Sequence, residues 1–120
     1  MRVIVCGGRD YKEDIHFDHV MTMLDDWFLG NTEVAHGGCS GADEMAHEWC
    51  IRNVKPDKEY IASWREHGNA AGPIRNALML SDFNPDLVVA FPGGKGTADM
   101  VAKAKAAGVT VILVGKNFPL

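Results

Sequence analysis

The chain has 120 residues, of which 47% are hydrophobic and 23% charged, with a formal net charge of −4. This is ordinary globular composition and excludes a disordered chain, a coiled coil and a fibrous repeat, so we expect one domain over residues 1–120. The mildly acidic balance disfavours non-specific nucleic-acid binding, which needs a broad basic surface. No apolar run approaches the roughly 20 residues of a membrane span, and the three cysteines form no CxxC pair. We therefore expect a cytoplasmic protein with free thiols and no membrane contact.

Four short apolar runs ended by glycine or a turn predict strands, and residues 58–62 are a further, weaker strand candidate. In chain order they span residues 2–6, 32–36, 58–62, 87–91 and 109–114. Between them, apolar residues recur at helical spacing. The predicted helices span residues 14–29, 40–53, 72–82 and 98–107, and residues 63–71 are expected to form a polar loop.

Strands that are apolar throughout and alternate with helices indicate a parallel sheet covered on both faces. The fold class is therefore α/β, a Rossmann-like three-layer sandwich with five strands. The doubly wound order 3-2-1-4-5 is preferred, and order 2-1-3-4-5 is the competitor.

Three strands lead directly into glycine-rich turns, at residues 6–9, 36–41 and 91–97. All three turns fall at the carboxyl ends of strands, the ligand edge of an open α/β sheet. Glycine lets backbone approach a ligand closely, and a following helix offers free N–H groups, so the turns favour a phosphate-bearing ligand over turn geometry alone. The candidate binding residues in these turns are Gly8, Arg9, Gly37, Gly38, Ser40, Gly41, Gly93, Gly94, Lys95, Gly96 and Thr97. Neither GxGxxG nor GxxxxGK[ST] is present, which disfavours an ordinary dinucleotide dehydrogenase and a P-loop NTPase.

Four further residues are candidates for this site. Arg75 falls in the first turn of a predicted helix, where a cation opposes the helix dipole, so a bound anion would explain it. The alternative is a solvated arginine or one paired with a carboxylate. Asp43 and Asp99 lie near helix starts, where they either cap the helix or bind ribose hydroxyls and act as acid or base. Trp64 either stacks on a base or packs within its loop.

Other polar and apolar groups are interpreted more simply. Ser40 to Asp43 has the form of a capping box. Asp43 and His47 are four residues apart with His36 nearby, but an exposed helix pair explains them, so neither a metal nor a cofactor is expected. Trp27 and Trp49 occupy apolar helical positions and are expected in the core.

Taken together, five segments resemble the SLOG superfamily, in its YspA or cpYpsA-related branch. They are residues 7–11 (GGRDY), 36–43 (HGGCSGAD), 64–68 (WREHG), 71–76 (AGPIRN) and 91–97 (FPGGKGT). The resemblance covers nearly the whole chain. It implies a Rossmann-like fold that binds nucleotides or nucleotide-derived ligands.

A more distant resemblance is to the LOG phosphoribohydrolases, whose loop reads PGGxGTxxE. Residues 92–97 match this loop, but the catalytic glutamate of those enzymes falls at Met100, and Asp99 is one residue away. Arg75 and Asn76 match the start of a LOG helix that carries an arginine. The resemblance thus implies a retained phosphate-binding half, to which Asn76 belongs, and an altered catalytic half.

The preferred hypothesis is a binding protein for a nucleotide or an ADP-ribose- or NAD-like molecule. The alternative is a LOG-like hydrolase of an N-glycosidic or phosphoribosyl bond, in which Asp99 or Asp43 is catalytic. A protein- or single-strand-DNA-binding module is a third hypothesis, against which the net charge of −4 argues. An apolar helix face at residues 27–29, together with the LOG resemblance, predicts a homodimer.

Overall fold

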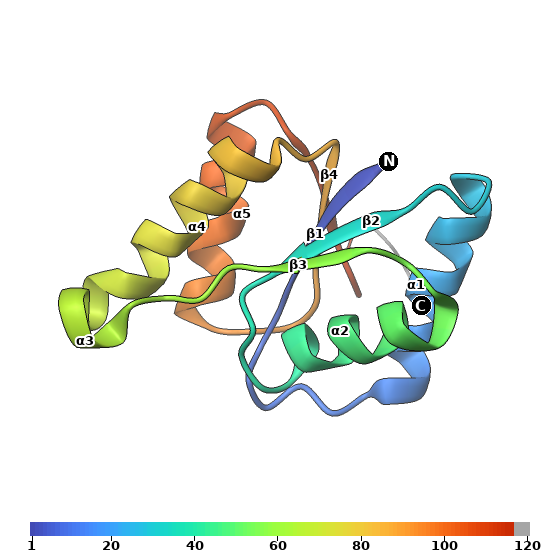
Figure 1. Cartoon of the computed structure of the whole chain (residues 1–120), viewed down its shortest axis with the longest axis horizontal. Helices are drawn as coiled ribbons and strands as arrows, with labels where there is room; N and C mark the ends of the chain where they lie inside the picture. Colours follow the sequence, from blue (N-terminus) through green and yellow to red (C-terminus); the bar gives the residue numbers. More distant parts are fainter. Residues whose placement is uncertain (117–120) are drawn as a thin grey trace.

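Five short parallel strands form the centre of the computed structural model, which describes residues 1–116 (Figure 1). The strands are β1 (Arg2–Cys6), β2 (Glu33–His36), β3 (Asp57–Glu59), β4 (Leu87–Ala90) and β5 (Thr110–Leu113). They lie in the order β3-β2-β1-β4-β5, and every neighbouring pair is parallel. The predicted α/β class and the order 3-2-1-4-5 are therefore confirmed, and the competing order is wrong.

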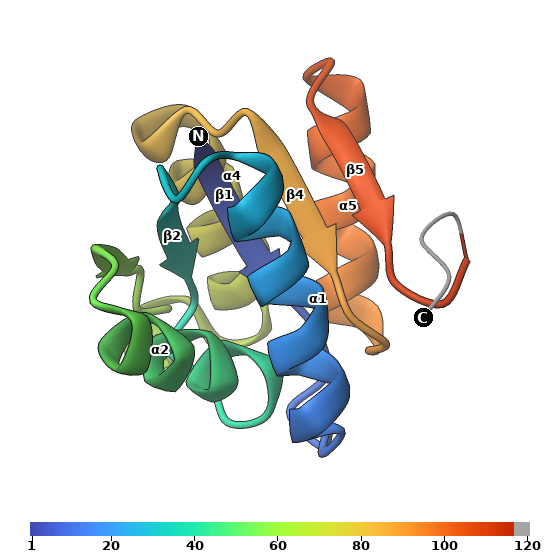
Figure 2. The ribbon, with the colours of Figure 1, turned by 90° about the vertical axis from the view of Figure 1, so that its right-hand side faces the viewer.

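Four longer helices cover the two faces of the sheet. They are α1 (Asp14–Trp27), α2 (Ala42–Asn53), α4 (Ala71–Phe83) and α5 (Lys95–Ala106). Helices α1 and α2 lie on one face and α4 and α5 on the other, which makes three layers (Figures 1 and 2). No helix within residues 1–116 is both long and apolar enough to cross a membrane.

Each face of the sheet carries its own buried cluster. Val3 and Val5 of β1 belong to the cluster under α1 and α2, which also contains Trp49. Ile4, between them in sequence, belongs to the opposite cluster with Met79 of α4. Successive strand residues point to opposite faces, so a central strand must be apolar throughout. Each such side chain, fully buried, stabilises the fold by about 1.5–3 kcal/mol.

Helix α1 places one apolar stripe on the sheet and leaves its C-terminal end exposed. Its buried residues are Phe17, Val20, Met21 and Leu24, at the spacing of a single helix face. The helix ends at Trp27, two residues earlier than predicted. The expectation that Trp27 lies in the core is wrong, because its residue surface is 60% exposed, whereas Trp49 is buried as predicted.

The segment between β3 and α4 differs most from the sequence-based prediction. Residues 63–71, expected as a loop, contain the short helix α3 (Trp64–His67) and a 3₁₀ turn over Gly68–Ala70. The turn runs directly into α4, which begins at Ala71, so Pro73 and Arg75 are its third and fifth residues. Helix α5 likewise begins at Lys95, three residues before the predicted start.

Candidate functional site

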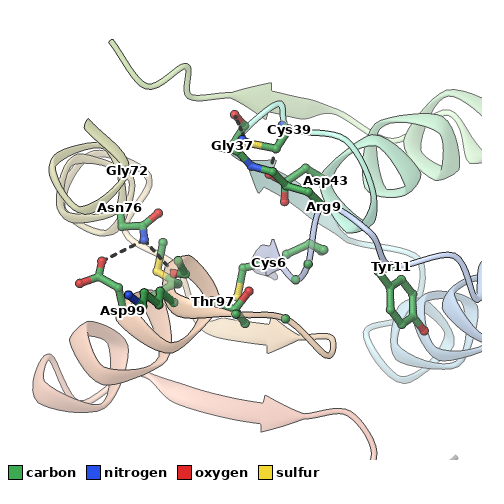
Figure 3. A pocket seen from close by; sticks show the side chains of 18 of the residues that line it. Cys6, Arg9, Tyr11, Gly37, Cys39, Asp43, Gly72, Asn76, Thr97 and Asp99 are labelled. Atoms are coloured by element: carbon green, nitrogen blue, oxygen red, sulfur yellow. Dashed lines mark hydrogen bonds between the residues drawn. The ribbon is translucent and has the colours of Figure 1, made fainter. Parts of the chain in front are cut away.

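The carboxyl ends of β1, β2 and β4 surround an open cleft of about 1010 Å³. The strand order places these three ends side by side, so the three glycine-rich turns meet there. In Figure 3, Cys6 at the end of β1 lies between two groups of lining residues. One group contains Asn76, Thr97 and Asp99, and the other contains Arg9, Gly37, Cys39 and Asp43. A cleft of this size accommodates a small organic ligand.

The turns after β1 and β4 are packed directly against each other. The N–H of Gly8 donates to the carbonyl of Pro92 at 2.9 Å. A Cβ on Gly93 would lie 2.6 Å from the backbone nitrogen of Gly8 and closer still to the hydroxyl of Thr97. A Cβ on Gly7 would lie 2.6 Å from that of Ala42. Gly7 and Gly93 are therefore required by the packing of the protein on itself.

The turn after β2 is built differently from the predicted capping box. Gly41, with φ of +76°, precedes α2 and makes no side-chain cap. The Ser40 hydroxyl donates instead to the carbonyl of Arg9 at 3.2 Å, and Asp43 Oδ2 accepts the N–H of Cys39 at 3.2 Å. The capping box is absent because the Ser40 side chain binds the turn after β1 and the Asp43 side chain binds Cys39 of its own turn. Gly38, Ser40 and Gly41 lie outside the lining of the cleft, unlike the other predicted turn residues.

Two glycines at the start of α5 border open space. A Cβ on Gly94 or Gly96 would meet no atom within 4 Å outside the helix. The first N–H groups of a helix have no partner inside it, and its dipole places positive charge at this end. Lys95 and Thr97 share this first turn and line the cleft. The start of α5 is therefore open to an anionic ligand.

Arg75 connects α4 to the ends of β2 and β3. Its Nη1 donates to the carbonyls of Gly37 at 2.9 Å and Tyr60 at 3.2 Å, and its Nε donates to Asn76 Oδ1 at 3.0 Å. The two backbone carbonyls give Arg75 structural partners that its sequence position did not indicate, and its binding of an anion stays a prediction. Its Nη2 makes no hydrogen bond with residues 1–116 and remains a donor for a ligand.

Asn76 and Asp99 join α4 to α5 at one side of the cleft (Figure 3). Asn76 Nδ2 donates to the carbonyl of Gly96 at 3.2 Å and to Asp99 Oδ2 at 3.0 Å, so both ends of its amide are occupied. Lys103 Nζ donates to both Asp99 oxygens, at 2.6 and 2.7 Å. Burial would raise the pKa of Asp99, but these hydrogen bonds outweigh burial and hold the pKa below its usual value. Asp99 is therefore an ionised structural partner.

Asp43 also lines the cleft, but its pKa is shifted in the opposite direction to that of Asp99. It is 7% exposed, and burial raises its pKa despite the N–H donors of Cys39 and Gly37 and the nearby charge of Arg75. A raised pKa lets a carboxyl group keep its proton to higher pH, which suits a proton donor. Cys6 beside it is a poor nucleophile, because burial and the charge of Asp43 raise the pKa of its thiol to about 12.

Arg9 and Trp64 meet across the cleft from different parts of the chain. The Arg9 guanidinium lies 5.2 Å from the centre of the Trp64 ring, which is within range of a cation–π interaction. Both residues line the cleft. The Trp64 ring, proposed to stack on a base, is therefore already paired with a cation, and a base would have to enter between them or displace Arg9.

This chain has recognisable sequence relatives. A profile of the family described as "YspA, cpYpsA-related SLOG family" matches residues 1–67, more than half of the chain. The chain belongs to this family. The resemblance inferred from its motifs is thereby confirmed. This SLOG family member is also 39% identical, over 123 aligned positions, to the Gene 61 protein of Mycobacterium phage D29, covering 95% of the chain and 96% of the relative.

Among solved structures, the SLOG chain resembles the X-ray structure of the protein TM1055. The two share 18% of their residues with a TM-score of 0.69, over 94% of this chain and 72% of the other. At this identity the likeness concerns the fold alone, and it agrees with a Rossmann-like arrangement.

Several groups that shape the cleft were not found in the sequence. Cys6 is the last residue of β1, so its position before a glycine turn was a usable signal. Gly72 and Met79 line the cleft, and Tyr60 offers Arg75 its carbonyl. Gly72 and Met79 reach the site through the packing of α4, and Tyr60 reaches it from the end of β3, so their places depend on tertiary structure.

We predict that Asp43→Asn makes the protein more stable at neutral pH. Because the folded-state pKa of Asp43 is raised, its contribution to stability is present below the ordinary pKa of about 4 and is lost as pH rises through the folded value. Asparagine keeps an acceptor for Cys39 and removes this loss. Urea unfolding at several pH values should show the advantage of the variant growing from acid to neutral pH.

Asp99→Asn is the matched control, because the pKa of Asp99 is lowered. It should reduce stability at neutral pH and have less effect in acid. If Asp43→Asn behaved the same way, Asp43 would be a stabilising charge and not a buried acid.

Proposed function

We propose that the cleft binds a nucleotide or a nucleotide-derived molecule of the ADP-ribose or NAD type. The start of α5 carries this proposal, because Gly94 and Gly96 leave its backbone N–H groups open beside the cleft. A phosphate placed there would receive backbone hydrogen bonds and the helix dipole, with Lys95 nearby. Membership of the SLOG family and a Rossmann-like fold support the same ligand class.

The remaining lining suits the rest of such a ligand. Arg75 Nη2 and the Arg9 guanidinium offer charge-assisted hydrogen bonds to phosphate. The Trp64 face offers stacking to a base, with Arg9 above it. Asp43 offers an acceptor for ribose hydroxyls. The ligand would then extend from α5 toward the turns after β1 and β2.

Calorimetric titration with AMP, ADP-ribose and NAD tests the proposal, with adenosine as the unphosphorylated control. At least one phosphorylated ligand should bind at least about tenfold more tightly than adenosine, which is about 1.4 kcal/mol. Equal weak binding of all four would reject the phosphate site. Single-stranded DNA serves as a further comparison, and salt-dependent binding to it alone would favour the nucleic-acid alternative.

A second candidate function is hydrolysis of an N-glycosidic or phosphoribosyl bond. The buried Asp43 favours it, because a carboxyl with a raised pKa can protonate a departing base. Asp99 is not suited to this role, since Lys103 and Asn76 hold it ionised. Chromatography should detect free base from AMP, NAD or ADP-ribose with the wild type and not with Asp43→Asn. Retained release in that variant would exclude Asp43 as the acid.

We also predict a homodimer. Trp27 and Leu29 are 60% and 86% exposed at the end of α1, and apolar groups of this size gain from burial against a second copy. Light scattering at micromolar concentration should give twice the chain mass of 13.1 kDa. Trp27→Glu should shift the mass to the monomer, whereas a wild-type mass of one chain would contradict the prediction.

A further inference from the structure

His36 is a buried titratable residue that directly precedes a glycine turn of the cleft. It ends β2 and is 1% exposed. Its Nδ1 accepts the N–H of Gly38 at 3.1 Å, and its Nε2 lies 2.8 Å from Asp57 Oδ2. An atom that accepts an N–H carries no proton, so the ring is neutral with its proton on Nε2, donated to Asp57.

The tautomer of His36 also decides whether His36, His47 and Asp57 form a metal site or a hydrogen-bonded network. His47 Nδ1 also lies 2.8 Å from Asp57 Oδ2, and the three side chains place ligand-type atoms within 4.8 Å of one another. A metal on Nε2 of His36 would require the proton on Nδ1, where it would face the N–H of Gly38. Asp57 accepts from both histidines without that conflict, so the trio is a network of hydrogen bonds.

We propose that His36 is the positioning residue of the turn at residues 37–41, and that a second proton on its ring releases this turn and weakens ligand binding. In the imidazolium both ring nitrogens are donors. The new Nδ1–H would then point at the N–H of Gly38, and two donors facing each other repel in place of the present hydrogen bond. Gly38 cannot accommodate this alone, because its φ is +72° and the Glu59 carboxylate packs against it.

Movement of this turn reaches the cleft through two hydrogen bonds. The carbonyl of Gly37 accepts from Arg75, and the N–H of Cys39 donates to Asp43. Displacing the turn would therefore disturb both Arg75 and Asp43. The effect on ligand binding rests on the function proposed above, whereas the effect on the turn does not.

Charged groups surround His36 on three elements. Strand β3 contributes Asp57 and Glu59, the latter opposite His36 in the sheet register. Helix α2 contributes Asp43 and His47, and α4 contributes Arg75, bound at Gly37. The carboxylates favour a second proton on the ring, whereas burial and the two cationic groups oppose it.

Nuclear magnetic resonance on the protein without ligand tests the positioning role. As pH is lowered from about 8, the ring nitrogens of His36 should change from the Nε2–H tautomer to the imidazolium. The Gly38 amide should shift with the same midpoint. In His36→Asn, Oδ1 can accept the Gly38 N–H but does not titrate, so that shift should disappear. His47→Gln should retain it.

A second measurement follows ligand affinity as pH is lowered. The probe is ADP-ribose, because its diphosphate does not titrate near neutral pH, whereas a phosphate monoester has a second pKa of about 6. Wild-type affinity should fall below the His36 midpoint by up to about tenfold per pH unit, the limit for one proton. His36→Asn should bind within about threefold of wild type at pH 8 and lose this dependence.

The two measurements separate the possible failures. If ADP-ribose does not bind at pH 8, the ligand proposal fails for this probe, and the resonance data alone decide the role of His36. A Gly38 amide that stays constant while His36 titrates would overturn the inference. So would a pH dependence that persists in His36→Asn, or equimolar Zn²⁺ shifting the His36 and His47 ring signals together.

Discussion

Arg75→Ala should weaken both the fold and the binding of a phosphorylated ligand. In the empty protein, the substitution removes hydrogen bonds from a guanidinium to the carbonyls of Gly37 and Tyr60. A hydrogen bond to a charged group contributes about 1.5–3 kcal/mol, and water can replace part of that at this half-buried site. We expect the free energy of unfolding to fall by about 1–2 kcal/mol. Urea unfolding without ligand measures this.

The affinity for ADP-ribose should fall by about 10- to 150-fold in the same variant, because Nη2 no longer contributes a charge-assisted hydrogen bond. Weak binding of adenosine should change little. Lys105→Ala is the charge-matched control, since it removes one positive charge from the exposed end of α5, and both quantities should stay near wild type. Lower stability with unchanged ADP-ribose affinity would show that Arg75 stabilises the fold and does not bind the ligand.

The strands were predictable because their signals are local, whereas their order rested on the preference for the usual doubly wound arrangement over order 2-1-3-4-5. Except for β3, each strand is a short apolar run ended by glycine or a turn, and burial on both faces leaves little freedom in composition. The length of β3 was not predictable, since Asp57–Glu59 is polar and becomes a strand only by pairing with β2. The same holds for α3, whose four residues show no helical apolar period and which leads into α4.

In the candidate site, too, local features were predictable and tertiary contacts were not. The glycine turns at the ends of β1, β2 and β4 were identifiable from sequence, and the strand order brings them together. The partners of Arg75 were not, because the carbonyls of Gly37 and Tyr60 come from residues 38 and 15 positions away. Asp57 was missed for the same reason, since it meets His36 only across the β2–β3 pair.

Adjacent glycines at the start of α5 should respond oppositely to substitution. Gly94→Val should leave the free energy of unfolding within about 1 kcal/mol of wild type, because its Cβ enters open space and only the capping preference suffers. ADP-ribose affinity should drop at least about a hundredfold, roughly 2.8 kcal/mol, since the side chain occupies the approach of the phosphate. Gly94→Ser keeps a good helix cap and should lose affinity to a smaller degree.

Gly93→Ala should instead destabilise the protein by about 1–3 kcal/mol, because its Cβ would lie 2.6 Å from the backbone nitrogen of Gly8. Thermal unfolding of the proteins without ligand measures the stability of both variants, and calorimetry with ADP-ribose measures their affinity. Gly93 and Gly94 cannot be distinguished from sequence alone. They differ because the turn after β1 packs against Gly93 and not against Gly94. Unchanged affinity in Gly94→Val would remove the start of α5 as the phosphate site, even if the stability contrast held.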